Sequence, residues 1–317
     1  MGEHDKEAQA IMIFCCTLGA TDGVVPFKNA EWRKLAQIMV ARKIQPSELL
    51  EMDVLTMVDR LGVEEKIAER LVALIGRSAS LSFEITKLEK EGIGLVTRAD
   101  KEYPAQLKKK MGDNCPPYFF YVGDLGLLRE KCVGFVGSRK MTTEDVDFES
   151  KLVEKVVKAR YGIVSGGANG ADKIAEEVGL ARNGKVIEFL SGRMLEKMRS
   201  SRVVKAIQGG KLLLMSCVAP KAGFSVGAAM GRNKFIFTQS EATIAIKSEG
   251  KSGTWAGVTE CLKEHYAPVY CWNNPKYSEN LELIKMGALP IDEKWEVKEI
   301  ELRETTEQTI LKQPMLL

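Results

Sequence analysis

From Lys131 onward, short apolar runs alternate with amphipathic stretches along the chain. The strand candidates are residues 132–136, 162–164, 186–190, 211–215, 243–246 and 268–271. Helical spacing of apolar residues predicts helices between them, near 143–159, 170–183, 194–208, 225–240 and 253–265. Such alternation is typical of parallel strands joined by right-handed crossovers. The sequence therefore predicts an α/β fold with a Rossmann-like, mostly parallel sheet and helices on both faces.

The first 92 residues lack this alternation, and their apolar residues recur at helical spacing, as in Trp32, Leu35 and Met39. Gly62 and Gly92 stand where glycines end helices. The turn around Gly62 is similar to a helix-hairpin-helix turn, which offers amides to a DNA phosphate, although short glycine turns join helices in many folds. At about 150 residues per domain, 317 residues suggest two domains. We expect a helical N-terminal domain at 1–92, a Rossmann-like domain at 93–291 and a short acidic tail at 292–317.

Composition places the chain among soluble proteins with a real core, because 45% of its residues are hydrophobic and 28% are charged. No apolar run approaches the roughly 18 residues of a membrane span, and acidic residues precede the first apolar stretch, unlike in a secretory signal. The seven cysteines show no disulfide-framework spacing. We expect a cytoplasmic protein with reduced thiols and no membrane partner.

Few residues are available for catalysis or for metal binding. The histidines are His4 and His265, and no G-x-S-x-G motif surrounds a serine. Cys261, His265 and Cys271 are the nearest approach to a zinc site, and buried thiols are the more usual role for such cysteines. We expect no catalytic residue, no metal, no cofactor and no enzymatic activity.

Ligands of a Rossmann-like sheet bind beyond the carboxyl ends of its strands. The first strand ends in Gly137, Ser138, Arg139 and Lys140, which combine close backbone approach, a hydroxyl and a guanidinium that fits phosphate. The second ends in a glycine-rich turn before a helix, whose N-terminal amides favour anions. The candidate residues of this turn are Ser165, Gly166, Gly167, Asn169 and Gly170, with Asp172 as a structural brace.

Two further loops belong to the same predicted edge. They contribute Arg232, Asn233 and Lys234, and then Ser252 and Gly253. Residues 245–252 have the spacing of a Walker A loop, but Ala245 replaces its first glycine, so we do not expect them to bind ATP in that way. The G-x-G-x-x-G pattern of dinucleotide enzymes is missing as well.

The net charge of +3 is too small to indicate a nucleic-acid partner by itself. Between residues 193 and 211, six basic residues stand with one acid, Glu196, so this segment could meet phosphates or form a solvated helix face. No aromatic platform for stacking bases is evident beyond Phe224, Phe235 and Phe237, for which core packing is the more usual role, so we expect little base preference.

In order and spacing, these motifs resemble the DprA (Smf) family of DNA-processing proteins over roughly residues 95 to 290. The matching pieces are Tyr103-Pro104 with Leu107, Pro116-Pro117, Tyr121-Val122-Gly123, Val136 to Arg139, Ser165-Gly166 with Gly170 and Asp172, Arg232-Asn233, Ser252-Gly253, Asn280-Leu281 and Gly287-Ala288. The resemblance implies a sterile-alpha-motif-like N-terminal domain. It also implies a non-enzymatic homodimer that binds single-stranded DNA and loads RecA recombinase, typically in natural transformation.

The chain departs from the family pattern at several places. The family usually has arginine where Asn169 stands, histidine where Glu176 stands and arginine where Lys234 stands, and a winged helix often follows the Rossmann-like domain. Two other classes of function stay open: a sensor or hydrolase of a nucleotide-derived small molecule, and an interaction scaffold. A two-fold patch could include Trp272, Leu281, Leu283 and Ile284, although burial within the chain is the more usual fate of such residues.

Overall fold

The computed structural model describes residues 5–19 and 23–300. The chain divides into two compact units. Unit 1 contains residues 1–122, 192–196 and 215–223, and unit 2 contains residues 123–191, 197–214 and 224–317.

Unit 1 begins with helices, which confirms the helical prediction for this region. They are α1 (Lys6–Cys15), α2 (Asn29–Arg42), the 3-10 helix η1 (Pro46–Glu51), α3 (Val54–Leu61), α4 (Glu65–Ile75) and α5 (Ser78–Lys90). Because α1 is apolar on all sides, it is buried from Ala8 to Cys15 except at Gln9. Gly62 follows α3 with a φ of 67°, so this glycine ends the helix as predicted. A role for its turn in DNA binding stays a prediction.

Unit 1 also contains two strands that our sequence analysis missed. β1 (Gly94–Thr97) and β2 (Tyr118–Val122) pair antiparallel, and α6 (Ala105–Met111) and the 3-10 helix η2 (Gly112–Asn114) lie between them in the chain. Strands of four or five residues carry too little periodicity to be separated from other short apolar runs.

Unit 2 is built on a sheet with strand order β6-β5-β4-β3-β7-β8-β9. The strands are β3 (Cys132–Val136), β4 (Gly162–Ser165), β5 (Val186–Leu190), β6 (Leu212–Ser216, of which the first three residues belong to unit 2), β7 (Ala242–Ala245), β8 (Val269–Trp272) and β9 (Leu289–Ile291). The pairs β3–β4, β4–β5, β3–β7, β7–β8 and β8–β9 are parallel. Every residue of β3, β4, β5, β7 and β8 is buried, as expected for a sheet covered on both faces.

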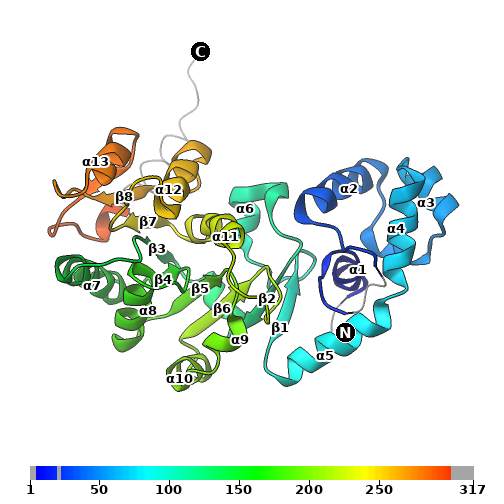
Figure 1. Cartoon of the computed structure of the whole chain (residues 1–317), viewed down its shortest axis with the longest axis horizontal. Coiled ribbons are helices and arrows are strands. Elements are labelled where there is room, and N and C mark those ends of the chain that lie inside the picture. Colours follow the sequence, from blue (N-terminus) through cyan, green and yellow to red (C-terminus); the bar gives the residue numbers. More distant parts are fainter. Residues whose placement is uncertain (1–4, 20–22, 301–317) are drawn as a thin grey trace, which may run out of the picture. The chain divides into compact units, whose positions relative to one another are not determined.

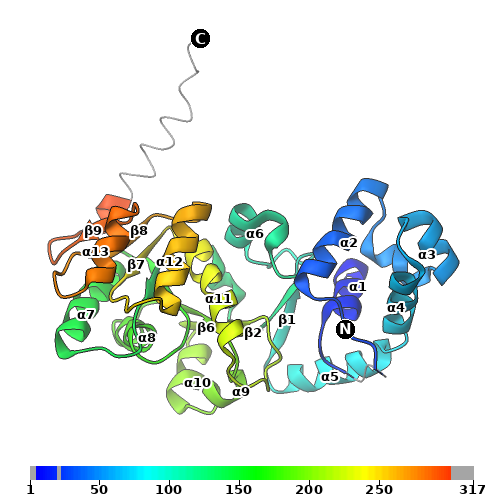
Figure 2. The ribbon, with the colours of Figure 1, turned by 45° about the horizontal axis from the view of Figure 1, so that its top comes forward.

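Helices cover both faces of this sheet. They are α7 (Thr143–Lys158), α8 (Ala171–Ala181), α10 (Ser201–Gln208), α11 (Val226–Gln239), α12 (Gly253–Glu264) and α13 (Ser278–Lys285). Figure 1 shows α7, α8 and α10 on one face and α11, α12 and α13 on the other, and Figure 2 shows the same two layers after rotation. The chain passes from β3 to β4 on one side of the sheet and later returns to β7 on the other. The gap between the ends of β3 and β7 is therefore the switch point, where ligands of such sheets bind.

The predicted Rossmann-like α/β fold is confirmed, and most predicted bounds differ from the observed ones by no more than two residues. The predicted helix near 194–208 is wrong in one respect. The chain forms α9 (Met194–Lys197) and α10 instead, because Ser200 takes an extended conformation between them. β9 and α13 were not predicted.

The end of the described chain packs against unit 2. Trp295, Val297 and Ile300 are buried, and Lys155 Nζ donates hydrogen bonds of 2.8 Å to the carbonyl oxygens of Glu293 and Trp295. The other residues of the predicted acidic tail, 301–317, lie outside the described residues. A division into compact units does not test where independently folding domains end, so the boundaries at 92 and 291 stay predictions.

Two of the four residues that were suggested for a two-fold patch are buried within the chain. Trp272 stacks on Phe148 with ring centroids 4.0 Å apart, and Leu283 is fully buried. The suggested two-fold patch is therefore wrong for Trp272 and Leu283. Within the described part of the chain, no helix is long and apolar enough to span a membrane.

One carboxyl group in α7 is buried without a hydrogen-bond partner among the described residues, which lowers the free energy of unfolding. Glu149 is fully buried, and neither of its carboxyl oxygens has a hydrogen-bond partner among the described residues. Burial raises the pKa of Glu149 well above its ordinary value, and the nearby carboxylates of Asp172 and Asp145 raise it further. The folded chain therefore keeps this proton to a higher pH than the unfolded chain does.

Replacing Glu149 with methionine should make the protein more stable at neutral pH. Because the pKa of Glu149 is raised in the folded state, the contribution of this one group to the free energy of unfolding falls as pH rises above about 4.3, the ordinary pKa of glutamate. The variant is free of this penalty, so its advantage over the wild type should grow from pH 4 to pH 7 and reach about 1–3 kcal/mol. Urea denaturation across this pH range measures the difference. Asp147→Met, at an exposed position of α7, should keep the wild-type pH dependence. An advantage of Glu149→Met that does not change with pH would contradict the assignment.

Candidate functional site

A pocket of about 480 Å³ lies at the switch point of unit 2. Its walls come from the ends of β3, β4 and β7 and from α11, which the sequence separates by up to about a hundred residues. It is lined by residues 136–140, Ala168, Asn169, Asp172, Phe224, Val226, Ala229, Met230, Arg232, Asn233, Ile236, Phe237, Glu249 and residues 251–254.

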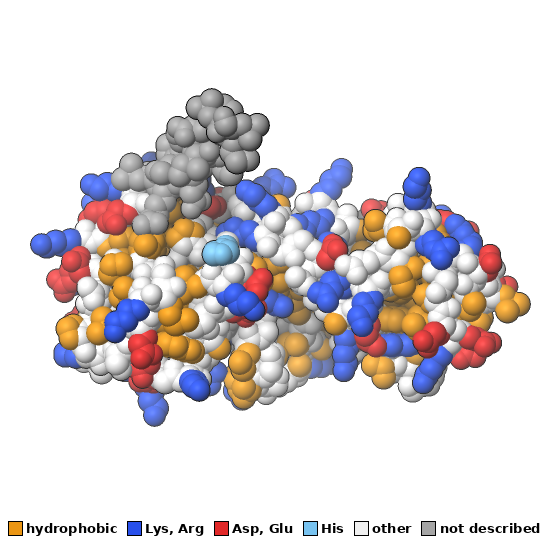
Figure 3. All heavy atoms as spheres, turned by 90° about the horizontal axis from the view of Figure 1, so that it is seen from above, with side chains coloured by type: hydrophobic (Ala, Val, Ile, Leu, Met, Phe, Trp, Pro, Cys, Tyr) orange, Lys and Arg blue, Asp and Glu red, His pale blue; other side chains and the backbone are white. Residues whose placement is uncertain are grey.

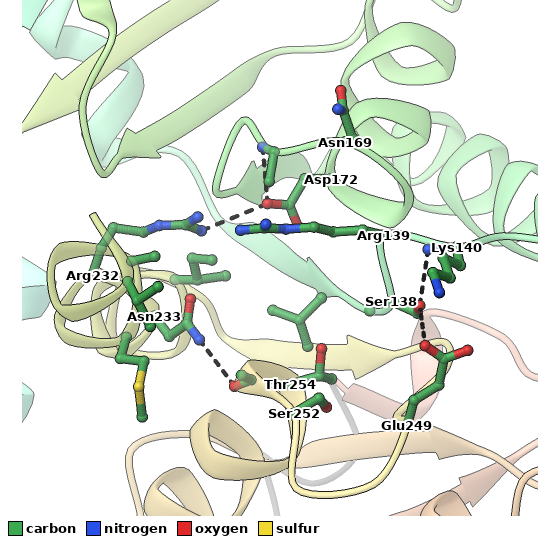
Figure 4. A pocket seen from close by; sticks show the side chains of 18 of the residues that line it. Ser138, Arg139, Lys140, Asn169, Asp172, Arg232, Asn233, Glu249, Ser252 and Thr254 are labelled. Atoms are coloured by element: carbon green, nitrogen blue, oxygen red, sulfur yellow. Dashed lines mark hydrogen bonds and ion pairs between the residues drawn. The ribbon is translucent and has the colours of Figure 1, made fainter. Parts of the chain in front are cut away.

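A buried ion pair holds one wall of the pocket together. Arg232 Nη1 of α11 lies 3.6 Å from Asp172 Oδ2 of α8, and both side chains are about nine-tenths buried. The backbone N–H of Ala168 donates a hydrogen bond of 3.1 Å to the same carboxylate oxygen. Figure 4 shows the guanidinium groups of Arg232 and Arg139 approaching Asp172 from opposite sides. Asp172 thus makes the contacts that the predicted bracing role requires.

Two glycines allow the backbone to approach its neighbours closely. A Cβ at Gly166 would lie 1.2 Å from Arg232 Nη1, so the guanidinium occupies the place of a side chain there. Gly170 has a φ of 81°, which favours glycine, and a Cβ at this position would lie 2.2 Å from the carbonyl oxygen of Ser138. A larger residue at 170 would therefore collide with backbone, whereas one at 166 would displace the Arg232 guanidinium.

Three cations of the pocket remain available for a ligand. Arg139, Lys140 and Lys251 are exposed, and none forms an ion pair with a carboxylate among the described residues. Arg139 Cζ lies 5.0 Å from the ring centroid of Phe224. The positive charge that faces solvent in the pocket therefore comes from these three side chains rather than from the buried Arg232.

The two carboxylates of the pocket are both engaged by neighbouring groups. Asp172 binds Arg232, while Glu249 accepts a hydrogen bond of 2.9 Å from Ser138 Oγ and lies 3.0 Å from Lys247 Nζ. The hydrogen bond from Lys247 lowers the pKa of Glu249, so this group is ionised at neutral pH. Neither carboxylate is placed as a free base.

Two helix N-termini border the pocket and add partial positive charge. α8 begins after Gly170, and α12 begins after Ser252, whose Oγ accepts a hydrogen bond of 3.3 Å from the N–H of Trp255. Asn233 Nδ2 donates a hydrogen bond of 3.0 Å to the carbonyl oxygen of Gly253, which ties α11 to the start of α12. Such helix ends favour an anion beside the free cations.

Most of the predicted site residues meet in this pocket. It is lined by Gly137, Ser138, Arg139, Lys140, Asn169, Arg232, Asn233, Ser252 and Gly253, together with Asp172. Ser165, Gly166, Gly167, Gly170 and Lys234 are not among its lining residues. Lys234 Nζ instead lies 5.8 Å from the ring centroid of Phe235. Whether each lining residue contacts a ligand stays a prediction.

In the loop with Walker A spacing, two backbone amides donate hydrogen bonds to side chains of the protein itself. The N–H of Ser248 donates to Asn280 Oδ1 at 2.9 Å, and the N–H of Gly250 donates to Glu279 Oε1 at 3.1 Å. With these amides bound to side chains of the α13 region, the loop does not form a phosphate cradle of the Walker A kind.

The predicted basic segment 193–211 is partly neutralised by acids that come from other elements. Lys197 contacts the buried carboxylates of Glu176 and Glu188, and Arg202 pairs with Glu176 and Glu177. Counting charges within the segment missed these partners, so the excess of basic charge is smaller than the sequence suggested. On another face of the molecule, which Figure 3 presents, Lys and Arg side chains are likewise scattered among acidic and apolar ones. Glu176, which replaces the usual histidine of the resembled family, is thus part of an internal ion network.

Some residues that line the pocket were not predicted as site residues from the sequence. Phe235 and Phe237 are buried, as core residues are, but Phe224 is 42% exposed and lines the pocket with Val226 and Met230. Glu249, Lys251 and Thr254 also line it. The position of Lys251 and Thr254 beside the motif Ser252-Gly253 was a usable signal, whereas the exposure of Phe224 could not be read from its neighbours in sequence.

Fold and site together define a Rossmann-like protein with an anion-favouring pocket at its switch point. The family model of DNA recombination-mediator protein A matches residues 94–300, and the chain belongs to this family. The DNA processing protein DprA of Bacillus subtilis (strain 168) is 26% identical over 215 residues, which are 66% of this chain and 71% of that protein.

Solved structures show the same fold. The crystal structure of DprA from Streptococcus pneumoniae matches with a TM-score of 0.62 and 21% identity, over 88% of this chain and 99% of that one. A structure of DprA from Helicobacter pylori, solved to explain that protein's single-stranded DNA binding mode, matches with a TM-score of 0.53 and 22% identity, over 68% of this chain and 96% of that one.

Replacing Gly166 with alanine should destabilise unit 2. The added methyl group would collide with Arg232 Nη1, so the guanidinium must leave Asp172 or the turn must shift. Overpacking of this kind costs about 1–3 kcal/mol of unfolding free energy, which urea denaturation measures. Gly231→Ala is the matched control, because a Cβ at that helical position meets nothing within 4 Å. The control gains about 0.5–1 kcal/mol from helix propensity alone, so the contradicting result is a Gly166→Ala variant that is as stable as the wild type.

Proposed function

We propose that this chain binds single-stranded DNA through the pocket at the switch point. One observation carries the proposal: three cations without an ion-pair partner in the part of the chain that the structure describes, Arg139, Lys140 and Lys251, line one pocket with the N-termini of α8 and α12. Phosphate groups are the ligands that this combination of side chains and helix ends suits. A flexible single strand can bring its phosphates into a concave site, where a stiff duplex cannot follow.

Membership in the DNA recombination-mediator family supports the same ligand. The Helicobacter pylori relative is described as binding single-stranded DNA, and its fold is shared with this chain. We propose that this chain, too, acts in DNA processing for recombination, and that it works in the cytoplasm, where such DNA is handled.

We further propose that the pocket binds without performing a reaction. Asp172 and Glu249 are engaged by Arg232, Ser138 and Lys247, so neither is poised as a general base. Among the described residues His265 is the one histidine, and it does not line the pocket. A pocket of this volume could also hold a single nucleotide, so a nucleotide panel belongs in the same binding experiment.

Removing the free cations should weaken binding to an oligothymidylate at every salt concentration. For each phosphate that is no longer neutralised, the slope of log K against log salt should become shallower by about 0.7. We expect this for Arg139→Ala and Lys251→Ala, measured by fluorescence anisotropy between low and physiological salt. Lys158→Ala, which removes an exposed cation of α7 outside the pocket, is the matched control.

Two results would contradict the proposal. Wild-type affinity and salt slope in the double variant Arg139→Ala, Lys251→Ala would place the DNA elsewhere. Tight binding of a mononucleotide together with weak binding of the oligothymidylate would favour the alternative of a nucleotide sensor. Asp172→Ala should not be used for this purpose, because it leaves Arg232 buried without its partner.

We propose, from family membership, that the chain forms a homodimer and loads a RecA-type recombinase. A dimer has two binding pockets. When one strand occupies both, the second binding event is intramolecular, which raises the overall affinity through effective concentration. Light scattering at micromolar concentration should give the mass of a dimer. RecA strand exchange on single strands coated with single-strand-binding protein should then be accelerated. A monomer that leaves strand exchange unchanged would contradict the loader role and leave the DNA-binding proposal standing.

A further inference from the structure

Beside the three free cations, the pocket carries an apolar surface that the chain itself does not cover. Phe224, Val226 and Met230 are 42%, 66% and 50% exposed, and all three line the pocket. We call these three residues the apolar rim. Exposed apolar side chains gathered at a binding pocket usually contact a ligand or partner.

Local structure fixes the rim in place. The N-cap residue Ser225 accepts a hydrogen bond of 3.1 Å from the N–H of Ala228, so α11 begins at Val226, two residues after Phe224. Val226 and Met230 stand four positions apart on this helix and therefore share one face. Arg232, two residues further on, is held by Asp172. Val226 and Met230 therefore belong to an anchored helix, and Phe224 lies directly before the N-cap residue of that helix.

The charge next to the rim indicates what covers it. Arg139 Cζ lies 5.0 Å from the ring centroid of Phe224, and Lys140 and Lys251 line the same pocket. An occupant must present anionic groups to these cations and flat apolar groups to Phe224. A single strand of nucleic acid does both, because each nucleotide carries one phosphate and one planar base.

We propose that the apolar rim receives unpaired bases, with Phe224 as the stacking platform, while Arg139, Lys140 and Lys251 hold the phosphates. This inference rests on the proposed binding of single-stranded DNA and adds the side chain on which the bases stack. Stacking tolerates every base, so little sequence preference follows. Selectivity for single strands does follow, since the base faces of a duplex are covered by their neighbours.

An abasic strand separates the two contributions. We would measure affinities for an oligothymidylate and for an oligonucleotide of the same length and phosphate count whose sugars carry no base. Phe224→Ala should weaken binding of the oligothymidylate by about tenfold, as the removal of one stacked base predicts. It should leave binding of the abasic strand unchanged. Phe224→Trp should retain the wild-type difference between the two strands, and its indole fluorescence should change with the oligothymidylate only.

Phe83→Ala is the matched control, because Phe83 is also exposed, at 69%, but belongs to unit 1 and does not line the pocket. Equally weakened binding of both strands by Phe224→Ala would overturn the stacking role, since the residue would then act on the backbone contacts. Unchanged affinities with a smaller mass in light scattering would overturn it as well and assign the rim to a second copy of the chain. If wild-type protein binds neither strand, the proposed function itself fails, and a base-specific effect cannot be produced.

Discussion

The site depends on the buried pair of Arg232 and Asp172. It joins α11 to the N-terminus of α8, and the guanidinium lies where a Cβ of Gly166 would be. Breaking such a pair from one side strands a charge in the interior, at a typical cost of about 3–5 kcal/mol. Because the same carboxylate accepts the N–H of Ala168, the pair also sets the shape of the turn after β4. The helix N-terminus and the surface of α11 therefore reach the pocket as one fixed wall.

The basic residues of the pocket have two different roles, one structural and one available to a ligand, which the sequence alone does not distinguish. Arg232 is used inside the wall, whereas Arg139, Lys140 and Lys251 face the pocket without ion-pair partners among the described residues. Glu249 lines the pocket with these three cations and is ionised. An incoming phosphate is therefore attracted by the cations and repelled by Glu249. A bound anion must lie close to the cations and away from Glu249. Bases packed against the apolar rim would add apolar contact to this electrostatic attraction.

Much of unit 2 and part of the site could be predicted from sequence, since the strand-helix alternation sets the order of the loops and parallel strands bring their carboxyl ends to one edge. Gly137 to Lys140, Asn169 and Arg232 met in one pocket for this reason. Long-range pairing could not be predicted. Lys197 finds Glu176 and Glu188 across the fold, which no count within residues 193–211 reveals. The exposure of Phe224 depends on where α11 begins, and β1 and β2 were too short to give a periodic signal.

The central claim is that single-stranded DNA lies in the pocket at the switch point of unit 2. Photo-crosslinking of an oligonucleotide that carries 4-thiothymidine, followed by mass spectrometry of the peptides, tests it most directly because it reports contact positions without any substitution. If single-stranded DNA occupies the pocket, crosslinks should fall within residues 137–140, 224–233 and 249–254. Crosslinks confined to unit 1, for example to the lysines of α6, or to residues 197–211 would contradict it.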